Sequence, residues 1–138
     1  MSRIRSKDTQ PEKLVRSALR RLRYRFRTYP LKLPGKPDIV LLRRRLLIFV
    51  HGCFWHRHRG CKFAYTPKSR VSFWRKKFRE NVERDSTRAK ELKKLGWRVS
   101  VIWECETKDL ARLERKIRLI LRSSTGRADA KFARKPIA

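Results

Sequence analysis

Acidic residues are scarce in this sequence: 12 Asp and Glu stand against 40 Lys and Arg, so the formal net charge is +28. Small soluble domains usually carry a net charge of about 2–8 in magnitude. A much larger excess of one sign repels itself unless an anionic partner neutralises it. Nucleic acid is the natural partner, because each phosphate contact releases condensed counterions. The composition therefore favours nucleic-acid binding over a merely solvated surface.

Long apolar runs are also missing. No stretch approaches the ~20 apolar residues that span a bilayer, and the basic first residues are not followed by the apolar segment of a signal peptide. Cysteine is limited to three residues, an odd number that makes a poor disulfide framework. We therefore expect a cytoplasmic protein, nucleoid-associated if bacterial, in which cysteines close to histidines favour a metal over a disulfide. The 138 residues suffice for one domain with a modest core.

One short segment, from Val50 to Cys61, concentrates the chemistry of the chain. It holds all three histidines and two of the three cysteines. It follows the apolar run 46–50, which predicts a buried β-strand. The spacing of Cys53, His58 and Cys61 is that of metal ligands. His51 and His56 remain at the strand end, where an imidazole can act as a base or bind a phosphate.

Local patterns place this segment in an α/β chain. Thr9 with Glu12 three residues later is a capping box, and helical spacing continues to about Arg23. Residues 39–42 and 46–50, joined by three arginines, predict a β-hairpin inside the core.

The second half of the chain predicts a long helix, a strand and a last helix. The long helix begins at Ser72 and ends before Gly96, and we expect Phe73 on its core face. The strand 97–103 follows, and Thr107 is expected to cap the last helix.

Asp38 stands in an unusual place, after Gly-x-Pro and at the head of a buried strand. A lone aspartate after proline is most simply explained as stabilising a turn. However, Pro-Asp at one strand and a polar residue at the end of the next is the layout of restriction-endonuclease-like nucleases. In those enzymes the second strand usually carries Glu-x-Lys, whereas this chain has Phe49-Val50-His51.

That departure and the loop after it make the chain resemble the very-short-patch-repair (Vsr) mismatch endonucleases. The resemblance runs from about Ile4 to about Leu121, in blocks that are long, ordered and correctly spaced. The blocks are Asp8-Thr9 with Glu12, then residues 33–38, 51–56, 73–74, 81–85, 95–99 and 103–105. The resemblance implies a restriction-endonuclease-like three-layer core with a central mixed β-sheet flanked by helices. We expect this domain over residues 1–122, followed by a basic, flexible tail at 123–138.

The resemblance also implies a structural zinc site. Its ligands would be Cys53, His58 and Cys61, with Cys105 as the fourth. A closed Cys₃His tetrahedron suits structural zinc, because it leaves no open position for catalysis. Two alternatives stay open: three ordinary buried thiols, or His56 as the ligand in place of His58, since the loop carries one extra residue near Gly60.

For catalysis the resemblance implies Mg²⁺, bound by the Asp38 carboxylate and by the backbone carbonyl of Val50. The family usually has Thr at the position of Val50, and a carbonyl ligand survives that change. Glu12 would be an outer partner of the metal, although its role in the capping box alone would explain it. His51 is the candidate general base.

His56 is the candidate donor to the scissile phosphate or the leaving oxygen, and Asp85 would orient one of the two imidazoles. DNA contacts would come from Phe54, Trp55 and Trp74, which match the residues that the family inserts beside the mismatch. Wedge insertion can discriminate, because a T·G pair unstacks more easily than a Watson–Crick pair.

The sequence therefore predicts a Mg²⁺-dependent endonuclease that nicks double-stranded DNA 5′ of the thymine at T·G mismatches, which arise when 5-methylcytosine deaminates. We expect a monomer, with mismatch-repair matchmaker proteins and a DNA polymerase as candidate further partners. One alternative is a zinc-stabilised DNA-binding module without activity. Another is a restriction-type nuclease of the same fold.

Overall fold

The computed structural model describes residues 9–28 and 33–124. Three α-helices, three strands and two short 3₁₀ helices follow one another along this part of the chain: α1 (Gln10–Arg21), β1 (Ile39–Leu41), η1 (Leu42–Arg44), β2 (Leu46–His51), α2 (Val71–Lys94), β3 (Arg98–Trp103), η2 (Glu104–Thr107) and α3 (Leu110–Ser124). The tail expected from residue 123 lies outside the described residues, apart from the last two residues of α3. The family block at Asp8 lies outside them as well.

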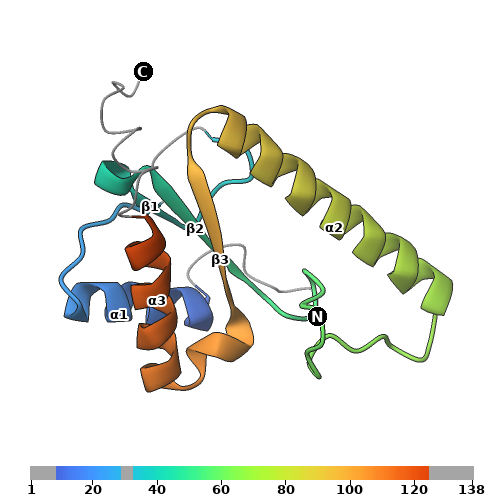
Figure 1. The fold of residues 1–138 in the computed structure, drawn as a ribbon. Coiled ribbons are helices and arrows are strands. Elements are labelled where there is room, and N and C mark those ends of the chain that lie inside the picture. The colour runs from blue at the N-terminus through green and yellow to red at the C-terminus, as the bar shows by residue number, and fades with distance from the viewer. Residues whose placement is uncertain (1–8, 29–32, 125–138) are drawn as a thin grey trace.

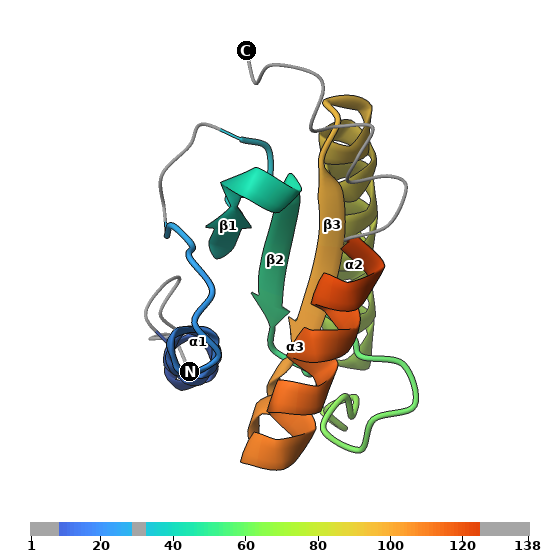
Figure 2. The ribbon, with the colours of Figure 1, turned by 60° about the vertical axis from the view of Figure 1, so that its left-hand side comes forward.

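The three strands form a mixed sheet in the order β1-β2-β3. β1 runs antiparallel to β2, with Ile39 opposite Ile48, and β2 runs parallel to β3, with His51 opposite Trp103. Helices α1 and α3 cover one face of the sheet and α2 covers the other (Figure 1, Figure 2). The predicted β-hairpin and the predicted mixed sheet between helices are confirmed. Among the described helices, none has both the length and the apolarity to cross a membrane.

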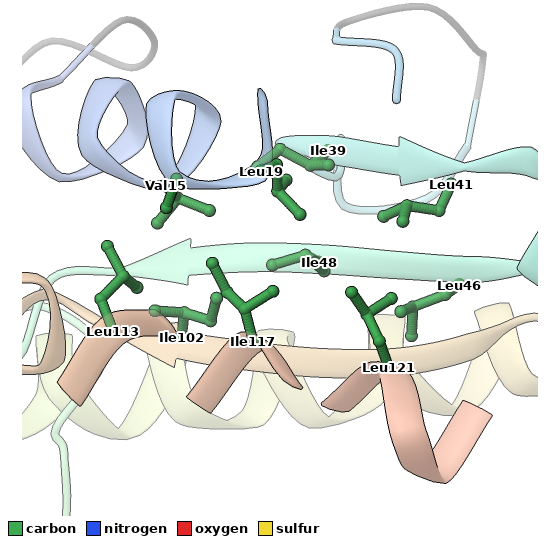
Figure 3. Packing of buried hydrophobic residues seen from close by; sticks show 11 residues of the cluster. Val15, Leu19, Ile39, Leu41, Leu46, Ile48, Ile102, Leu113, Ile117 and Leu121 are labelled. Carbon is green, nitrogen blue, oxygen red and sulfur yellow. The ribbon is translucent and has the colours of Figure 1, made fainter. Parts of the chain in front are cut away.

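The main core lies between the sheet and the helices α1 and α3 (Figure 3). Period-two alternation turns Leu46 and Ile48 of β2 toward this face, and helical spacing supplies the opposing side chains. Burial of each large aliphatic side chain contributes about 1.5–3 kcal/mol. The cluster comprises Val15, Ala18, Leu19, Ile39, Leu41, Leu46, Ile48, Ile102, Leu113, Ile117 and Leu121.

The second face of the sheet carries a smaller core, in which Val40 and Leu47 pack with Leu92 and Trp97. Leu92 is in the last turn of α2, so only the C-terminal part of this helix is seated on the sheet. The rest of α2 extends past the sheet and runs beside the loop that follows β2 (Figure 1). This overhang brings α2 to the segment that the sequence marks as chemically important.

The helix ends follow the sequence signals with one exception. The Thr9 hydroxyl caps α1, accepting a hydrogen bond from the Glu12 N–H at 3.4 Å, and Gly96 with φ 95° follows α2 as expected. The prediction that Thr107 caps the last helix is wrong. Thr107 lies in η2 and donates to the Glu104 carbonyl, whereas the Asp109 carboxylate accepts from the first N–H groups of α3. The extra 3₁₀ turn moves the helix start beyond Thr107.

The prediction that Phe73 faces the core is also wrong, since 45% of Phe73 is exposed. Phe73 is in the first turn of α2, and this N-terminal end of the helix lies beyond the edge of the sheet. The buried ring at this end of α2 is Phe78, one turn later, which packs against the loop after β2.

Candidate active site and metal centre

The two parallel strands β2 and β3 end at the same edge of the sheet, and both groups of predicted site residues lie there. A cleft of about 1090 Å³ opens at this edge. Its walls come from the first turn of α1, the end of β2, the middle of α2 and the end of β3. Polar side chains along these walls include Glu12, Asp38, His51, His56, Asp85 and Glu104. All five residues predicted for catalysis therefore line one cleft.

Asp38 precedes β1 and reaches across to β2, where its Oδ2 accepts a hydrogen bond of 2.7 Å from the Val50 N–H. A turn-stabilising aspartate would bond its own turn, so this cross-strand bond does not support the turn explanation. Burial raises the pKa of Asp38 to about 7, and the nearby Glu12 carboxylate adds to the rise. A buried carboxylate beside a second one is a place where a cation is stabilising.

Glu12 is 3% exposed and contacts the N-cap residue of α1. Its Oε2 accepts from the Thr9 hydroxyl at 3.2 Å, the same hydroxyl that caps α1. Its Oε1 lies 3.6 Å from an Arg16 guanidinium nitrogen. The same side chain also lines the cleft. Several carboxylate side chains line the cleft, and carboxylate oxygens are ligands that Mg²⁺ prefers.

The two histidines of the cleft form a stacked pair. The rings of His51 and His56 are nearly parallel, 8° apart, with centroids separated by 3.9 Å. The Nδ1 atom of His56 lies 2.6 Å from Oδ2 of Asp85, so Asp85 orients His56 and not His51. Burial, together with the neighbouring His56, lowers the pKa of His51 to about 4. His51 is therefore neutral at pH 7 in the protein without metal or DNA, and it is a weaker base there than an ordinary imidazole.

A second group of side chains, three cysteines and one histidine, lies near the histidine pair. The ligand atoms of Cys53, His58, Cys61 and Cys105 all lie within 4.8 Å of one another. Nδ1 of His58 is 3.6 Å from Sγ of Cys53 and 3.5 Å from Sγ of Cys105. A tetrahedral zinc ion bound at about 2.3 Å to sulfur and about 2.0 Å to nitrogen separates two such ligands by about 3.5 Å. The cluster can therefore hold a metal such as zinc, with His58 and not His56 as its histidine.

Trp103 connects the two centres and was not singled out from the sequence. Its ring stacks on His58 at 4.2 Å and meets the edge of His51 at 5.3 Å. The signal was available, because the last residue of β3 must lie beside the last residue of β2 in a parallel pair. A metal bound by His58 would thus fix one wall of the cleft.

The predicted DNA-contacting residues form one aromatic cluster above the cleft. The ring of Phe54 is at its centre, with centroids of neighbouring rings between 5.1 and 5.7 Å away. Trp55 and Trp74 also contact each other at 5.8 Å. The other two members of this cluster, Tyr65 and Phe78, were not predicted as site residues. We call these five residues, Phe54, Trp55, Tyr65, Trp74 and Phe78, the aromatic cluster.

Helix α2 holds the loop that follows β2 through two side chains that are one helical turn apart. Asn81, only 9% exposed, donates from Nδ2 to the Trp55 carbonyl at 3.2 Å. Asp85, four residues later, holds His56. The loop residues that they hold are consecutive, so one rigid helix positions an aromatic side chain and an imidazole together. Asn81 lies in a family block but had no assigned role.

A strongly cationic α/β protein with a carboxylate and two imidazoles at the strand ends has the site of a phosphodiester-cleaving enzyme that acts on DNA. Comparison with known proteins agrees. Residues 1–62 match the model of the family "DNA mismatch endonuclease Vsr". The chain is 51% identical over 121 residues to the type II nicking enzyme V.XorIIP of Xanthomonas oryzae pv. oryzae, covering 88% of each protein.

Two further relatives extend the match. The type II nicking enzyme V.NmeAIP of Neisseria meningitidis is 44% identical over 124 residues, or 87% of this chain and 88% of the relative. The DNA mismatch endonuclease Vsr of Escherichia coli K12 is 44% identical over 105 residues, or 76% of this chain and 67% of that protein. The protein belongs to the Vsr family of DNA mismatch endonucleases and is an endonuclease.

The buried Asp38 carboxylate leads to a prediction on stability. A carboxyl group whose pKa is higher in the folded protein than in the unfolded chain stabilises the fold fully below pH ~4, and this stabilisation is lost as the pH rises through about 7. Asp38→Asn keeps an acceptor for the Val50 N–H and removes the charge. We expect it to raise the free energy of unfolding of the metal-free protein by about 1–4 kcal/mol at pH 8, and by much less at pH 4.

The measurement is urea denaturation in EDTA at both pH values. Asp109→Asn is the control, since asparagine caps a helix as well as aspartate does. It should leave the free energy of unfolding unchanged at both pH values. Equal stability of wild type and Asp38→Asn at pH 8 would contradict the description of Asp38 as a buried charge without a counterion.

The cysteine cluster leads to a second prediction. We expect the purified protein to contain about one zinc ion, and His58→Asn to lose it with a fall in the melting temperature, because a structural zinc contributes its binding energy to folding. His56→Asn, on the neighbouring turn of the same loop, should keep its zinc. Metal analysis and thermal melts of the two variants test this. Zinc loss from His56→Asn with retention in His58→Asn would reverse the ligand assignment.

Proposed function

We propose that this protein is a Mg²⁺-dependent endonuclease that nicks one strand of double-stranded DNA 5′ of the thymine at a T·G mismatch. The observation that carries the proposal is the meeting, in one cleft, of the Asp38 carboxylate with the stacked pair of His51 and His56, directly beside the aromatic cluster. The similarity to a protein named DNA mismatch endonuclease supports it.

The Asp38 carboxylate and the Val50 backbone carbonyl would hold the Mg²⁺ ion, with Glu12 as an outer partner. When bound, Mg²⁺ neutralises charge that develops on the phosphate in the transition state. The raised pKa of Asp38 supports this assignment, since burial disfavours the charged carboxylate, the Glu12 charge adds to this effect, and a cation beside the carboxylate would offset both. The replacement of the usual Thr by Val50 is compatible, because the carbonyl belongs to the backbone.

The two imidazoles have different environments, and this suggests their roles. His51 is neutral, so it takes a proton from the attacking water as the water oxygen forms a bond to phosphorus. The bond from phosphorus to the leaving sugar oxygen breaks, and that oxygen gains a proton. His56, held by the Asp85 carboxylate, is the donor to the phosphate or to the leaving oxygen. Asp85 thus acts through His56, in the way that a carboxylate orients a catalytic histidine elsewhere.

Recognition of the mismatch would use Phe54, Trp55 and Trp74 as a wedge. Their rings pack edge-to-face or at a tilt, so the group is already formed before DNA arrives. Insertion of aromatic side chains requires unstacking of a base step, which is least unfavourable at a mismatch. Because α2 holds Trp55 and His56 together, insertion of the wedge would set the position of the imidazole relative to the backbone.

Several further features belong to the proposal as expectations. They are the restriction-endonuclease-like variant of the α/β fold, the monomeric state, a location at the bacterial nucleoid, and cooperation with mismatch-repair proteins and a polymerase. The alternative of a binding module without activity disagrees with the family to which the protein belongs, since the relatives are named as endonucleases and nicking enzymes. A restriction-type specificity for matched DNA differs from the proposal only in its substrate.

The test is a nicking assay on a T·G duplex and on the matched C·G duplex. With Mg²⁺ we expect a single nick 5′ of the thymine in the T·G duplex only, and no nick in EDTA. Asp38→Asn should reduce the rate at least ~10³-fold, because it removes a metal ligand, while leaving the dissociation constant for DNA within about threefold. Equal nicking of both duplexes would favour the restriction-type alternative, and wild-type nicking by Asp38→Asn would refute the metal assignment.

A further inference from the structure

Arg57 differs from the other cations of the site in that the protein itself occupies its hydrogen-bonding groups. Its NH1 nitrogen donates to the carbonyls of Phe54 and Tyr65 at 3.2 and 3.0 Å. Its NH2 nitrogen donates to the Ala64 carbonyl at 2.9 Å and to the Thr66 hydroxyl at 3.3 Å. Each terminal nitrogen of a guanidinium carries two N–H groups. All four N–H groups of the two terminal nitrogens are therefore engaged, and none of these four remains for a phosphate.

The flat face of the same guanidinium is also covered. It lies 3.7 Å from the ring centroid of Phe78, a buried residue of α2. The Arg57 backbone has φ 55°, a conformation that is unfavourable for residues other than glycine. Arg57 thus joins three parts of the chain: the loop that carries Phe54, the segment 64–66, and α2. A residue placed in this way positions its neighbours and does not bind a phosphate through its terminal nitrogens.

The segment that Arg57 fixes carries Tyr65. Three consecutive residues, Ala64 to Thr66, are bound to one guanidinium, so the backbone on both sides of Tyr65 is anchored. Yet 62% of Tyr65 is exposed, the largest fraction among the exposed large hydrophobic residues described. Its ring lies 5.1 Å from that of Phe54, at 45°. The structure therefore holds a large ring in solvent, in contact with the central residue of the proposed wedge.

We propose that Tyr65 is a further DNA-contacting residue, which stacks on a nucleobase next to the step opened by Phe54, Trp55 and Trp74, and that Arg57 is the residue that positions it. The inference rests on the proposed function to the extent that the aromatic cluster faces DNA. Two observations favour nucleic acid as the occupant of this surface. The surface is continuous with the wedge, and the +28 charge of the chain is complementary to a polyanion.

Phe63 provides a matched comparison two residues away. It is also an exposed aromatic, at 43%, in the same loop. A Lys62 ammonium lies 5.3 Å from its ring, and within the described chain no ring contact joins it to the aromatic cluster. If exposure alone made a residue bind DNA, Phe63 and Tyr65 would contribute alike. If attachment to the wedge matters, only Tyr65 contributes.

The first experiment measures the dissociation constant for the T·G duplex in EDTA, by fluorescence anisotropy. Stacking of one base on an aromatic side chain predicts a rise of about tenfold for Tyr65→Ala. Tyr65→Phe, which keeps the ring, should stay within about twofold, and so should Phe63→Ala. In Mg²⁺, Tyr65→Ala should raise KM and leave kcat at saturating DNA within about twofold, because Tyr65 touches no reacting group. A 2-aminopurine base beside the mismatch should show less unstacking with Tyr65→Ala.

The second experiment tests whether Arg57 acts through Tyr65. Arg57→Lys keeps the charge but not the four-donor fork, and Arg57→Gly removes the side chain while relieving the backbone conformation. Both should weaken DNA binding about as much as Tyr65→Ala does, with zinc content unchanged. Addition of Tyr65→Ala to Arg57→Lys should have little further effect, since two residues in one interaction are not additive. Arg59→Lys, on an exposed neighbour, is the control.

The outcomes separate this inference from the proposed function. If the wild type nicks T·G selectively while Tyr65→Ala binds and nicks like the wild type, the inference is overturned and the proposed function stands. If the wild type does not nick T·G but Tyr65→Ala still weakens DNA binding, the inference stands and the proposed function fails. Full additivity of the Arg57→Lys and Tyr65→Ala effects overturns the positioning role of Arg57.

Discussion

The parallel pairing of β2 with β3 is the constraint on which both centres depend. Its register places His51 opposite Trp103. Two residues beyond that pair, Cys53 and Cys105 come together, and the Cys105 N–H donates to the Cys53 sulfur at 3.4 Å. A shift of the register by one residue would turn every side chain of β2 to the other face. The core contacts of Leu46 and Ile48 oppose such a shift, so ordinary hydrophobic packing sets the geometry of the site.

Helix α2 adds a second constraint that the sheet alone could not supply. A long loop after a strand can take many conformations, and its ordering is entropically unfavourable. Here the cysteine cluster holds the loop at Cys53, His58 and Cys61. Between Cys53 and His58, helix α2 holds the loop through Asn81 and Asp85, which bind two consecutive loop residues. Because α2 is a single rigid element attached to the sheet near Leu92, it relates the aromatic cluster to the cleft.

Much of this arrangement could be predicted from the sequence, because it depends on periodicity and spacing. Two short apolar runs joined by three arginines predicted the hairpin, the capping-box pattern predicted the start of α1, and Cys53-x₄-His58-x₂-Cys61 predicted three of the metal ligands. What could not be predicted depends on three-dimensional arrangement, that is, on how far the sheet extends beneath α2 and on which groups the loop brings together. Phe73 fits a helical stripe, but the sheet does not extend beneath it. Arg57 looks like any other cation in a basic loop, since three of its four internal acceptors are backbone carbonyls, which carry no sequence signal, and the fourth is the hydroxyl of Thr66.

The site combines two features that are each unfavourable in the free protein. Asp38 is a buried carboxylate near Glu12, and Tyr65 is an aromatic ring held in water. At ordinary positions of a stable domain, a neutral side chain would stand in place of the buried carboxylate, and the aromatic ring would be buried in the core. In the complex that we propose, a divalent cation beside Asp38 and a nucleobase stacked on Tyr65 would make both features favourable at the same edge of the sheet. The stability that the free protein forgoes at this edge would then be available as differential affinity for DNA with the metal, which is the form of binding energy that an endonuclease can use.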